Sequence, residues 1–192
     1  MRYAPADMLW ASRGFSQGLR ERVSDLTELI FDERSELGDY LKAGDVLEGA
    51  ARVIITAYVS ASSGSGEQVL PEQFRVLISR YADSSHTVLT SFGNPYLLSA
   101  LPGMGTYLLA WGNREVSQRA ALRALFGEEG ISGRLPIPLP PFHDLGNGLD
   151  RIKVAERLAS VNVEDPLQAA GILDWRDTSG GSESQQRLVD PG

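Results

Sequence analysis

The chain has 192 residues, no cysteine and a formal net charge of −7 at pH 7. The missing cysteines exclude disulfides and thiolate metal sites, and an acidic chain is a poor partner for nucleic-acid phosphates. No stretch reaches the ~20 apolar residues of a membrane-spanning helix, and residues 1–20 lack the apolar run of a secretory signal. We therefore expect no nucleic-acid or membrane partner and, for the chain as written, a cytoplasmic location.

The first part of the chain has weak secondary-structure signals. Residues 1–24 hold one short apolar patch and are predicted to be an N-terminal extension, and residues 19–30 show rough helical spacing. Residues 32–39 are charged and predicted to be solvated. Residues 52–59 (RVIITAYV) form a nearly continuous β-branched run, which is typical of a strand buried on both faces of a parallel sheet. A Gly/Ser-rich loop follows at 60–66.

A helix is predicted to begin at Pro71, where proline is tolerated in the first turn. Its apolar side chains fall at i, i+3, i+4 and i+7, on one face. These are Phe74, Leu77, Ile78 and Tyr81.

Two further buried strands are predicted at 87–92 and 106–111. Between 114 and 126 an alanine-rich pattern predicts a helix, with Asn113 as its N-cap and Gly127 as the residue that ends it. Strands that alternate with helices indicate a mainly parallel sheet sandwiched by helices, a Rossmann-like or flavodoxin-like α/β sandwich.

The end of the chain is less regular. Residues 135–139 contain two prolines, which cannot donate a ladder hydrogen bond, so they predict an edge strand or an extended arm. Residues 151–160 are predicted to be a last helix within a C-terminal helical extension, 150–175. Residues 176–192 are polar and Gly/Ser-rich, which predicts a disordered tail.

Two glycine-containing motifs partly match known functional motifs, a dinucleotide-binding turn and a nucleophile elbow. Residues 63–69 (SGSGEQV) lie between a strand and a helix, as a dinucleotide-binding turn would, but Val69 replaces the third glycine. A flexible loop is favoured, with a nucleotide site as the alternative. Residues 14–18 (GFSQG) match the nucleophile elbow G-x-S-x-G, but too little chain precedes them for the strands of that fold, so the match is interpreted as chance.

The ionisable side chains give no metal or catalytic centre. Neither His86 nor His143 has further ligands at a suitable spacing, so structural roles are favoured and no metal or cofactor is predicted. Glycosidases use two carboxyls about 5–10 Å apart on opposite sides of a sugar bond. The adjacent pairs at 32–33 and 128–129 do not face each other in this way and are interpreted as surface charge.

A set of short motifs between 88 and 140 has a specific order and spacing. They are Phe92-Gly93-Asn94-Pro95-Tyr96, Ser117-Gln118, Leu125-Phe126-Gly127-Glu128 and Ile131-Ser132-Gly133-Arg134-Leu135-Pro136. With these motifs, residues 25–149 resemble the C-terminal domain of glycoside hydrolase family 3, in the branch similar to bacterial β-N-acetylhexosaminidases.

The resemblance implies a role but no complete active site. In the family, a (β/α)₈-like barrel of about 250 residues precedes this domain, and it carries the nucleophile Asp and, in this branch, a His–Asp acid/base pair. The present chain is too short to contain both, so no catalytic residue is assigned. The expected function is that of an accessory or structural domain, inactive alone, with a family 3 barrel as its partner. The parent reaction would be hydrolysis of O-glycosyl bonds, of β-N-acetylhexosaminides in particular.

Four residues are candidates for positions near a sugar. Glu67 is the only carboxylate in the loop where other family members carry an acid/base Glu. Asn94, Tyr96 and Trp111 end or follow strands, and sugars stack on aromatic rings such as the last two. The alternative function is an independent sugar- or nucleotide-binding module.

A domain that evolved against a barrel is expected to expose apolar side chains at its strand ends. The alternative is that the same side chains pack inside the domain. The candidates are Tyr96, Leu97, Leu98, Leu101, Met104 and Phe142.

Overall fold

A computed structural model describes residues 1–59 and 70–154 and shows a five-stranded, all-parallel sheet of order β2-β1-β3-β4-β5. The elements are β1 (Arg2–Tyr3), η1 (Ala6–Ser12), α1 (Arg13–Arg20), β2 (Ile30–Phe31), α2 (Leu37–Glu48), β3 (Val53–Ala57), α3 (Glu72–Ser79), β4 (Thr87–Phe92), α4 (Leu97–Ala100), β5 (Tyr107–Ala110) and α5 (Glu115–Leu125). Within the described ranges no helix is long and apolar enough to cross a bilayer.

The three predicted strands are confirmed as β3, β4 and β5, which are neighbours and run parallel. Val53 is paired with Thr87 at the start of the β3–β4 ladder, and Leu89 with Tyr107 at the start of the β4–β5 ladder. The continuous apolar runs of β3 and β4 follow from burial of both faces. The predicted α/β sandwich is therefore the observed fold.

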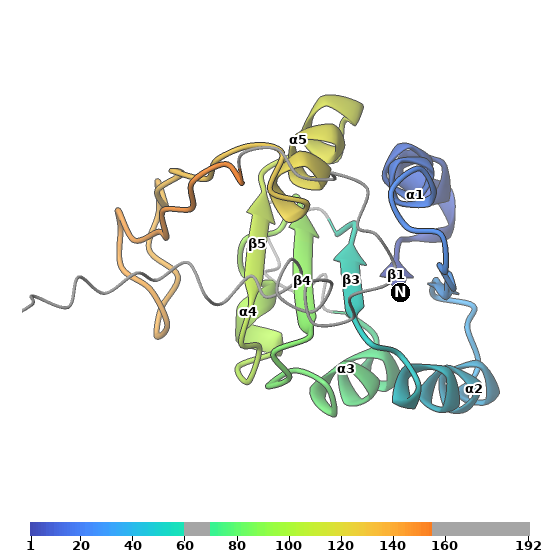
Figure 1. The fold of residues 1–192 in the computed structure, drawn as a ribbon. Coiled ribbons are helices and arrows are strands. Elements are labelled where there is room, and N and C mark those ends of the chain that lie inside the picture. The colour runs from blue at the N-terminus through green and yellow to red at the C-terminus, as the bar shows by residue number, and fades with distance from the viewer. Residues whose placement is uncertain (60–69, 155–192) are drawn as a thin grey trace, which may run out of the picture. The chain divides into compact units, whose positions relative to one another are not determined.

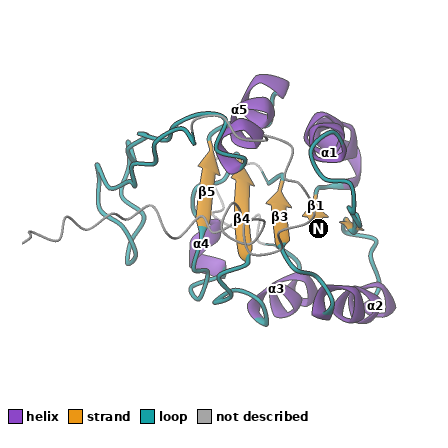
Figure 2. Ribbon diagram, in the orientation of Figure 1, coloured by secondary structure: helices purple, strands orange, loops and turns teal. Residues whose placement is uncertain are grey.

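Helices cover both faces of the sheet (Figure 1). Helices α1 and α5 lie on one face, where Phe92 stacks on Tyr58 and meets Phe15 edge-on, with ring centroids 4.7 and 5.4 Å apart. Helices α2, α3 and α4 supply the core of the other face, where Phe31 stacks on Tyr40 with centroids 4.8 Å apart. Figure 2 shows the same two helical layers on either side of the strands. The Phe15–Phe92 and Phe31–Tyr40 contacts each join a helix to the sheet, whereas the Tyr58–Phe92 contact joins neighbouring strand ends.

The first part of the chain differs from its predicted role. Residues 1–24 contribute β1, which lies between β2 and β3, and α1, and the compact unit spans Met1–Val154. Residues 32–39 are mostly exposed, as predicted, and α2 begins within them at Leu37. A reciprocal capping box between Glu36 and Asp39 satisfies backbone N–H groups of this first turn.

Two predicted helix starts are displaced by one residue. Pro71 is the N-cap of α3 rather than its first residue, and Arg114, not Asn113, is the N-cap of α5. Arg114 has extended backbone angles and caps the helix without a side-chain hydrogen bond. The carbonyl of Asn113 instead accepts a hydrogen bond from inside the helix, as described below.

The predicted end of α5 at Gly127 is confirmed. Gly127 has φ +67°, and its N–H donates to Ala124 while the Glu128 N–H donates to Arg123, over 3.1 and 2.8 Å. This pair of bonds is a Schellman motif, which requires the left-handed conformation that glycine adopts at low cost. A Cβ at this position would also lie 2.8 Å from Cγ2 of Val154.

Residues 131–154 form an extended arm, one of the two predicted alternatives for 135–139. Its two limbs run antiparallel, with isolated bridges from Ile131 to Arg151 and from Leu139 to His143. An ion pair of 2.5 Å between Arg134 and Asp150 also joins them.

The helix predicted for 151–160 is wrong at its start, because Arg151 forms the bridge with Ile131. Residues from 155 onward lie outside the described part. The predicted disordered tail, 176–192, also lies there.

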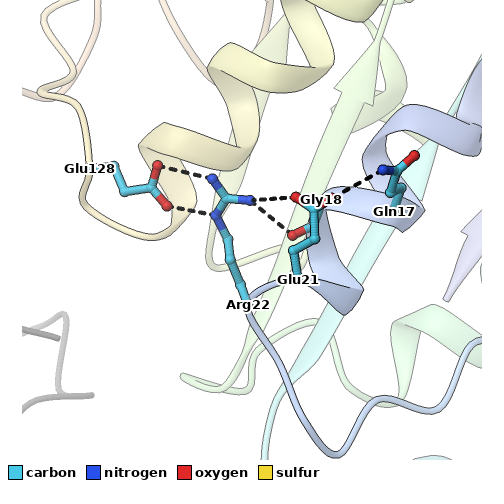
Figure 3. A network of polar contacts seen from close by, with 5 residues as sticks. All are labelled: Gln17, Gly18, Glu21, Arg22 and Glu128. Carbon is cyan, nitrogen blue, oxygen red and sulfur yellow. Dashed lines mark hydrogen bonds and ion pairs between the residues drawn. The ribbon is translucent and has the colours of Figure 1, made fainter. Parts of the chain in front are cut away.

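A polar network connects α1 to the segment that follows α5 (Figure 3). The Arg22 guanidinium donates to both carboxylate oxygens of Glu128, over 2.6 and 3.0 Å, and to the carbonyl of Gly18 over 3.0 Å. It also lies over the Phe126 ring, 5.7 Å from its centroid. The hydrogen bonds that Arg22 donates to the Glu128 carboxylate lower the pKa of that carboxyl. The two helices on this face are thus held together by a bidentate ion pair as well as by apolar packing.

Replacing Glu128 with Gln is expected to lower the free energy of unfolding by about 0.5–1 kcal/mol at pH 7, because the pair is partly exposed. A carboxyl with a lowered pKa in the folded state stabilises the fold above its unfolded pKa, about 4.3, and loses this effect as the pH falls through the folded value. The difference between the two proteins should therefore shrink as the pH falls below about 4.3.

Urea unfolding at several pH values measures this difference. The matched control is Glu129→Gln, because Glu129 forms an ion pair with Arg123 in which both side chains are about half exposed. A wild-type advantage over the Glu128 variant that stays constant from pH 7 to pH 3 would contradict the proposed pair.

Candidate functional site at the carboxyl edge of the sheet

The strand order places a topological switch point between β1 and β3. The chain leaves β1 toward α1 and β2 on one side, and leaves β3 toward α3 and β4 on the other. Where two such connections diverge in an open parallel sheet, a crevice forms outside the carboxyl ends of the strands, and ligands bind there. The candidate site therefore consists of the segments that follow β1, β3, β4 and β5.

Gln118 of α5 joins these segments. Its Nε2 donates to the carbonyl of Ala11, at the end of η1, and to that of Asn113 over 2.7 Å. Its Oε1 accepts from the Phe15 N–H over 2.8 Å and from the Tyr58 hydroxyl over 3.5 Å. The buried amide thus uses two donor and two acceptor positions, and it ties α1, η1 and the ends of β3 and β5 together.

Tyr58 reaches Gln118 as a neutral donor. Burial raises the pKa of its hydroxyl, with a smaller opposing effect from the Arg2 cation. The phenol therefore keeps its proton at neutral pH and serves the structure of this edge, not proton transfer.

Asn94 is built into the turn after β4. Gly93 has φ 122°, and the Asn94 side-chain oxygen accepts from the Tyr96 N–H over 2.9 Å. The Asn94 carbonyl accepts from the hydroxyls of Ser91 and Tyr107, over 2.6 and 3.3 Å. Burial raises the pKa of Tyr107 to about 12, so that hydroxyl remains a donor. The structure thus buries Asn94 with its oxygen engaged in the turn, and its role near a sugar stays a prediction.

Exposed aromatic rings lie at this edge. Tyr96 and Trp111, both 48% exposed, follow β4 and β5, which end side by side. Sequence reasoning missed Trp10, which is 62% exposed on η1 after β1. Since Gln118 Nε2 binds the carbonyls of residues 11 and 113, the segments that carry Trp10 and Trp111 approach each other. The fourth candidate, Glu67, lies outside the described residues.

Carboxylates are few in the described part of this edge, where η1 after β1 carries Asp7. The segments 93–106 and 111–114 contain no Asp, Glu or His. Searching the described residues, we find no group of three or more His, Asp or Glu side chains that could hold a metal ion. What these segments offer chemically is aromatic stacking and backbone hydrogen bonding.

The two glycine motifs lie apart from this chemistry. Ser16 of the GFSQG motif is buried within α1, where its hydroxyl accepts a hydrogen bond from Arg2 Nη1 over 2.6 Å. It is not at a strand-to-helix turn, so the interpretation as a chance match is confirmed. The motif at 63–69 lies outside the described residues.

The predicted set of exposed apolar side chains at the strand ends is wrong for most of its members. The α4 segment turns its apolar side chains into the core, and Phe142 is partly buried against the same cluster. The buried members are Leu97, Leu98, Leu101 and Met104. Only Tyr96 remains largely accessible, which agrees with the alternative that these residues pack inside the domain.

Comparison with protein-family models and with curated proteins gives no match. Among solved structures, the chain is similar to a glycoside hydrolase family 3 beta-N-acetylglucosaminidase from Paenibacillus sp. str. FPU-7, with a TM-score of 0.54 and 20% sequence identity. The match covers 65% of this chain but only 23% of that protein, so the chain spans less than a quarter of its length. At this identity the likeness shows a common fold: this α/β sandwich is similar to a part of that family 3 glycoside hydrolase.

Proposed function

We propose that this chain is an accessory domain of the family 3 glycoside hydrolase type, which acts with a catalytic barrel and is inactive alone. The observation that carries the proposal is the fold shared with part of a family 3 enzyme. The parent reaction would be retaining hydrolysis of β-N-acetylhexosaminides, which needs a nucleophile and an acid/base group. In this proposal the barrel supplies both groups.

The carboxyl edge is the part of the domain that we assign to the sugar side. Its exposed rings, Tyr96 and Trp111, offer apolar faces to a pyranose, and the described segments around them supply no carboxyl. An edge of this kind holds a sugar in place for chemistry performed by another part of the enzyme. The proposal therefore predicts a contribution to substrate binding without turnover.

The test uses 4-nitrophenyl N-acetyl-β-D-glucosaminide as substrate and a family 3 barrel from the same genome, purified separately. The chain alone should release no nitrophenol above a protein-free blank, and adding it should accelerate the barrel. Trp111→Ala should lower that acceleration several-fold, because a stacking ring contributes on the order of 1 kcal/mol. The control is Leu41→Ala, an exposed position on α2 outside the carboxyl edge.

Two results would contradict the proposal: turnover by the chain alone that survives repurification, or a barrel whose rate the chain does not change. A small sugar-binding module is the second candidate, favoured by the exposure of the same rings. Binding of N-acetylglucosamine to the chain without any barrel, seen as shifts of the Trp111 indole resonance, would support that module.

A further inference from the structure

Arg2 carries a partly buried positive charge that no ion pair neutralises within the described residues. It lies on β1 beside α1 (Figure 1), where its Nη1 donates to the Ser16 hydroxyl over 2.6 Å and to the Ser12 carbonyl over 3.5 Å. Its Nε is buried without a hydrogen-bond partner. Burial lowers the pKa of Arg2, although an arginine stays charged at neutral pH. A positive charge in this position is stabilised by negative charge nearby.

Arg13 and Arg20 add two positive charges on the same side of α1. Ser16 lies between them on the helix, three residues after Arg13 and four before Arg20, so the three side chains are neighbours on one face. Both arginines are exposed, and the charge of each contributes to the lowered pKa of Arg2. Three guanidinium groups therefore lie around the Ser16 hydroxyl, and Arg13 forms no ion pair with another described residue.

Glu28 is the carboxylate that faces these cations. It forms an ion pair with Arg20 and accepts a hydrogen bond from Ser16. Burial alone would raise the pKa of Glu28, but the hydrogen bonds from Ser16 and Arg20 and the nearby positive charges lower it. The carboxylate is therefore ionised at neutral pH and cancels one of the three positive charges. The arginine cluster, as we call the three guanidinium groups together with Glu28, keeps a net charge of +2 in a chain whose net charge is −7.

Other charged groups in the first part of the chain do not neutralise the arginine cluster. Glu21 accepts a hydrogen bond from Gln17 over 3.1 Å, and Glu33 accepts one from a backbone N–H over 2.9 Å. Both carboxylates are thus engaged outside the cluster. Burial lowers the pKa of the Met1 amine to about 6, so this amine is mostly neutral at pH 7. The excess of positive charge is local, and two of its three cations are open to solvent.

We propose that the arginine cluster binds a phosphate group, either as the free ion or on a small phosphorylated molecule. Arg13 and Arg20 supply exposed N–H donors in the planar fork that fits phosphate oxygens, and Arg2 supplies a third positive charge behind them. A phosphate monoester carries about −1.5 to −2 charges at pH 7, which matches the net charge of the cluster, whereas a carboxylate carries only one. Arg20 ends α1 and Glu28 precedes β2, so the cluster lies apart from the carboxyl ends of the strands. The inference is therefore independent of the proposed glycosidase role.

The experiment is an NMR titration of the isotope-labelled full chain at about pH 7.5 and low ionic strength, where exposed charges are weakly screened. The probes are inorganic phosphate and glucose 6-phosphate. At least one should bind with a Kd of about 1 mM or tighter, with amide shifts centred on residues 13–20, and acetate should bind at least about fivefold more weakly. A tighter Kd for glucose 6-phosphate would indicate a phosphorylated small molecule, and equal Kd values would indicate the free ion.

Charge substitutions test the arginine cluster in both directions. Arg13→Gln and Arg20→Gln should each weaken phosphate binding about fivefold, since each removes one positive charge in contact with the phosphate. Glu28→Gln should instead tighten binding, because it removes the competing carboxylate and frees Arg20. The matched control is Arg119→Gln on α5, where the side chain is 67% exposed against 64% for Arg20, and its Kd should be unchanged.

Opposite effects of substituting opposite charges cannot come from a general loss of folding. A Kd weaker than about 1 mM for both probes would overturn the proposal. Equal weakening by Arg119→Gln would also overturn it, because phosphate would then respond to the total charge alone. Weaker binding after Glu28→Gln would do the same, because the carboxylate would then support the phosphate instead of competing with it.

Discussion

Replacing Gln118 with leucine is expected to destabilise the domain by about 3–5 kcal/mol, because it leaves two buried backbone groups and a partly buried one without a partner at once. The Phe15 N–H loses its acceptor, and the carbonyls of Ala11 and Asn113 lose their common donor. A leucine fits the volume of the site but satisfies none of these groups, each of which costs about 1–3 kcal/mol when buried unpaired. Urea unfolding followed by circular dichroism measures the loss.

The matched control is Arg119→Leu, one position further along α5. Arg119 is exposed and forms only a long ion pair of 3.9 Å with Glu115, so the change should stay within about 0.5 kcal/mol. Gln118→Glu tests the donor half separately, since a glutamate keeps the acceptor but has no N–H for the two carbonyls. If Gln118→Leu costs less than about 1 kcal/mol, the hydrogen bonds of this amide do not hold the edge together.

The centre of the fold was predictable because its strands are long and apolar. β3 and β4 are continuous apolar runs, which are typical of strands buried on both faces. The end of α5 was predictable because glycine adopts the left-handed conformation of a Schellman motif without strain. β1 and β2 have two residues each, too few for any period to appear. Their place in the sheet depends on pairing with β3 and on packing of α1, which the local sequence does not encode.

The shortness of β1 also explains why one aromatic residue of the candidate site could not be predicted from the sequence. Tyr96 and Trp111 were recognised because they follow predictable strands, whereas Trp10 follows β1 and was missed. The role of Gln118 was hidden because a glutamine on an amphipathic helix is ordinary on its own. Its four partners come from positions 5 to 107 residues away, and only the folded chain brings them together. One local signal was available and unused: Glu36 with Asp39, spaced as in a capping box.

Alanine substitutions at the two glycines of α1 are expected to have opposite effects. At Gly14, a new Cβ would lie 3.5 Å from Gln118 Oε1 and 3.7 Å from Glu115 Cγ, both ordinary contacts. The substitution should stabilise the domain by about 0.5–1 kcal/mol, because alanine is the better helix former. At Gly18, the Cβ would overlap with Cδ1 of Leu122 across the α1–α5 interface, and Leu122 is buried.

Gly18→Ala should therefore cost about 1–3 kcal/mol through overpacking, despite the same gain in helix propensity. The two variants each add one methyl group to the same helix and differ only in its position, so the gap between them, about 1.5–4 kcal/mol, isolates the close approach of α1 to α5. Adding Leu122→Val to Gly18→Ala removes the δ-methyl group that collides and should recover part of the loss. The free energy of unfolding of both single variants is measured in urea. If the two values are equal, α1 and α5 are too far apart for a methyl group at position 18 to collide with Leu122. Gln118 lies on the same helix, one turn before Leu122. That outcome would therefore also contradict the close contact by which the Gln118 amide binds the segments that carry Trp10 and Trp111.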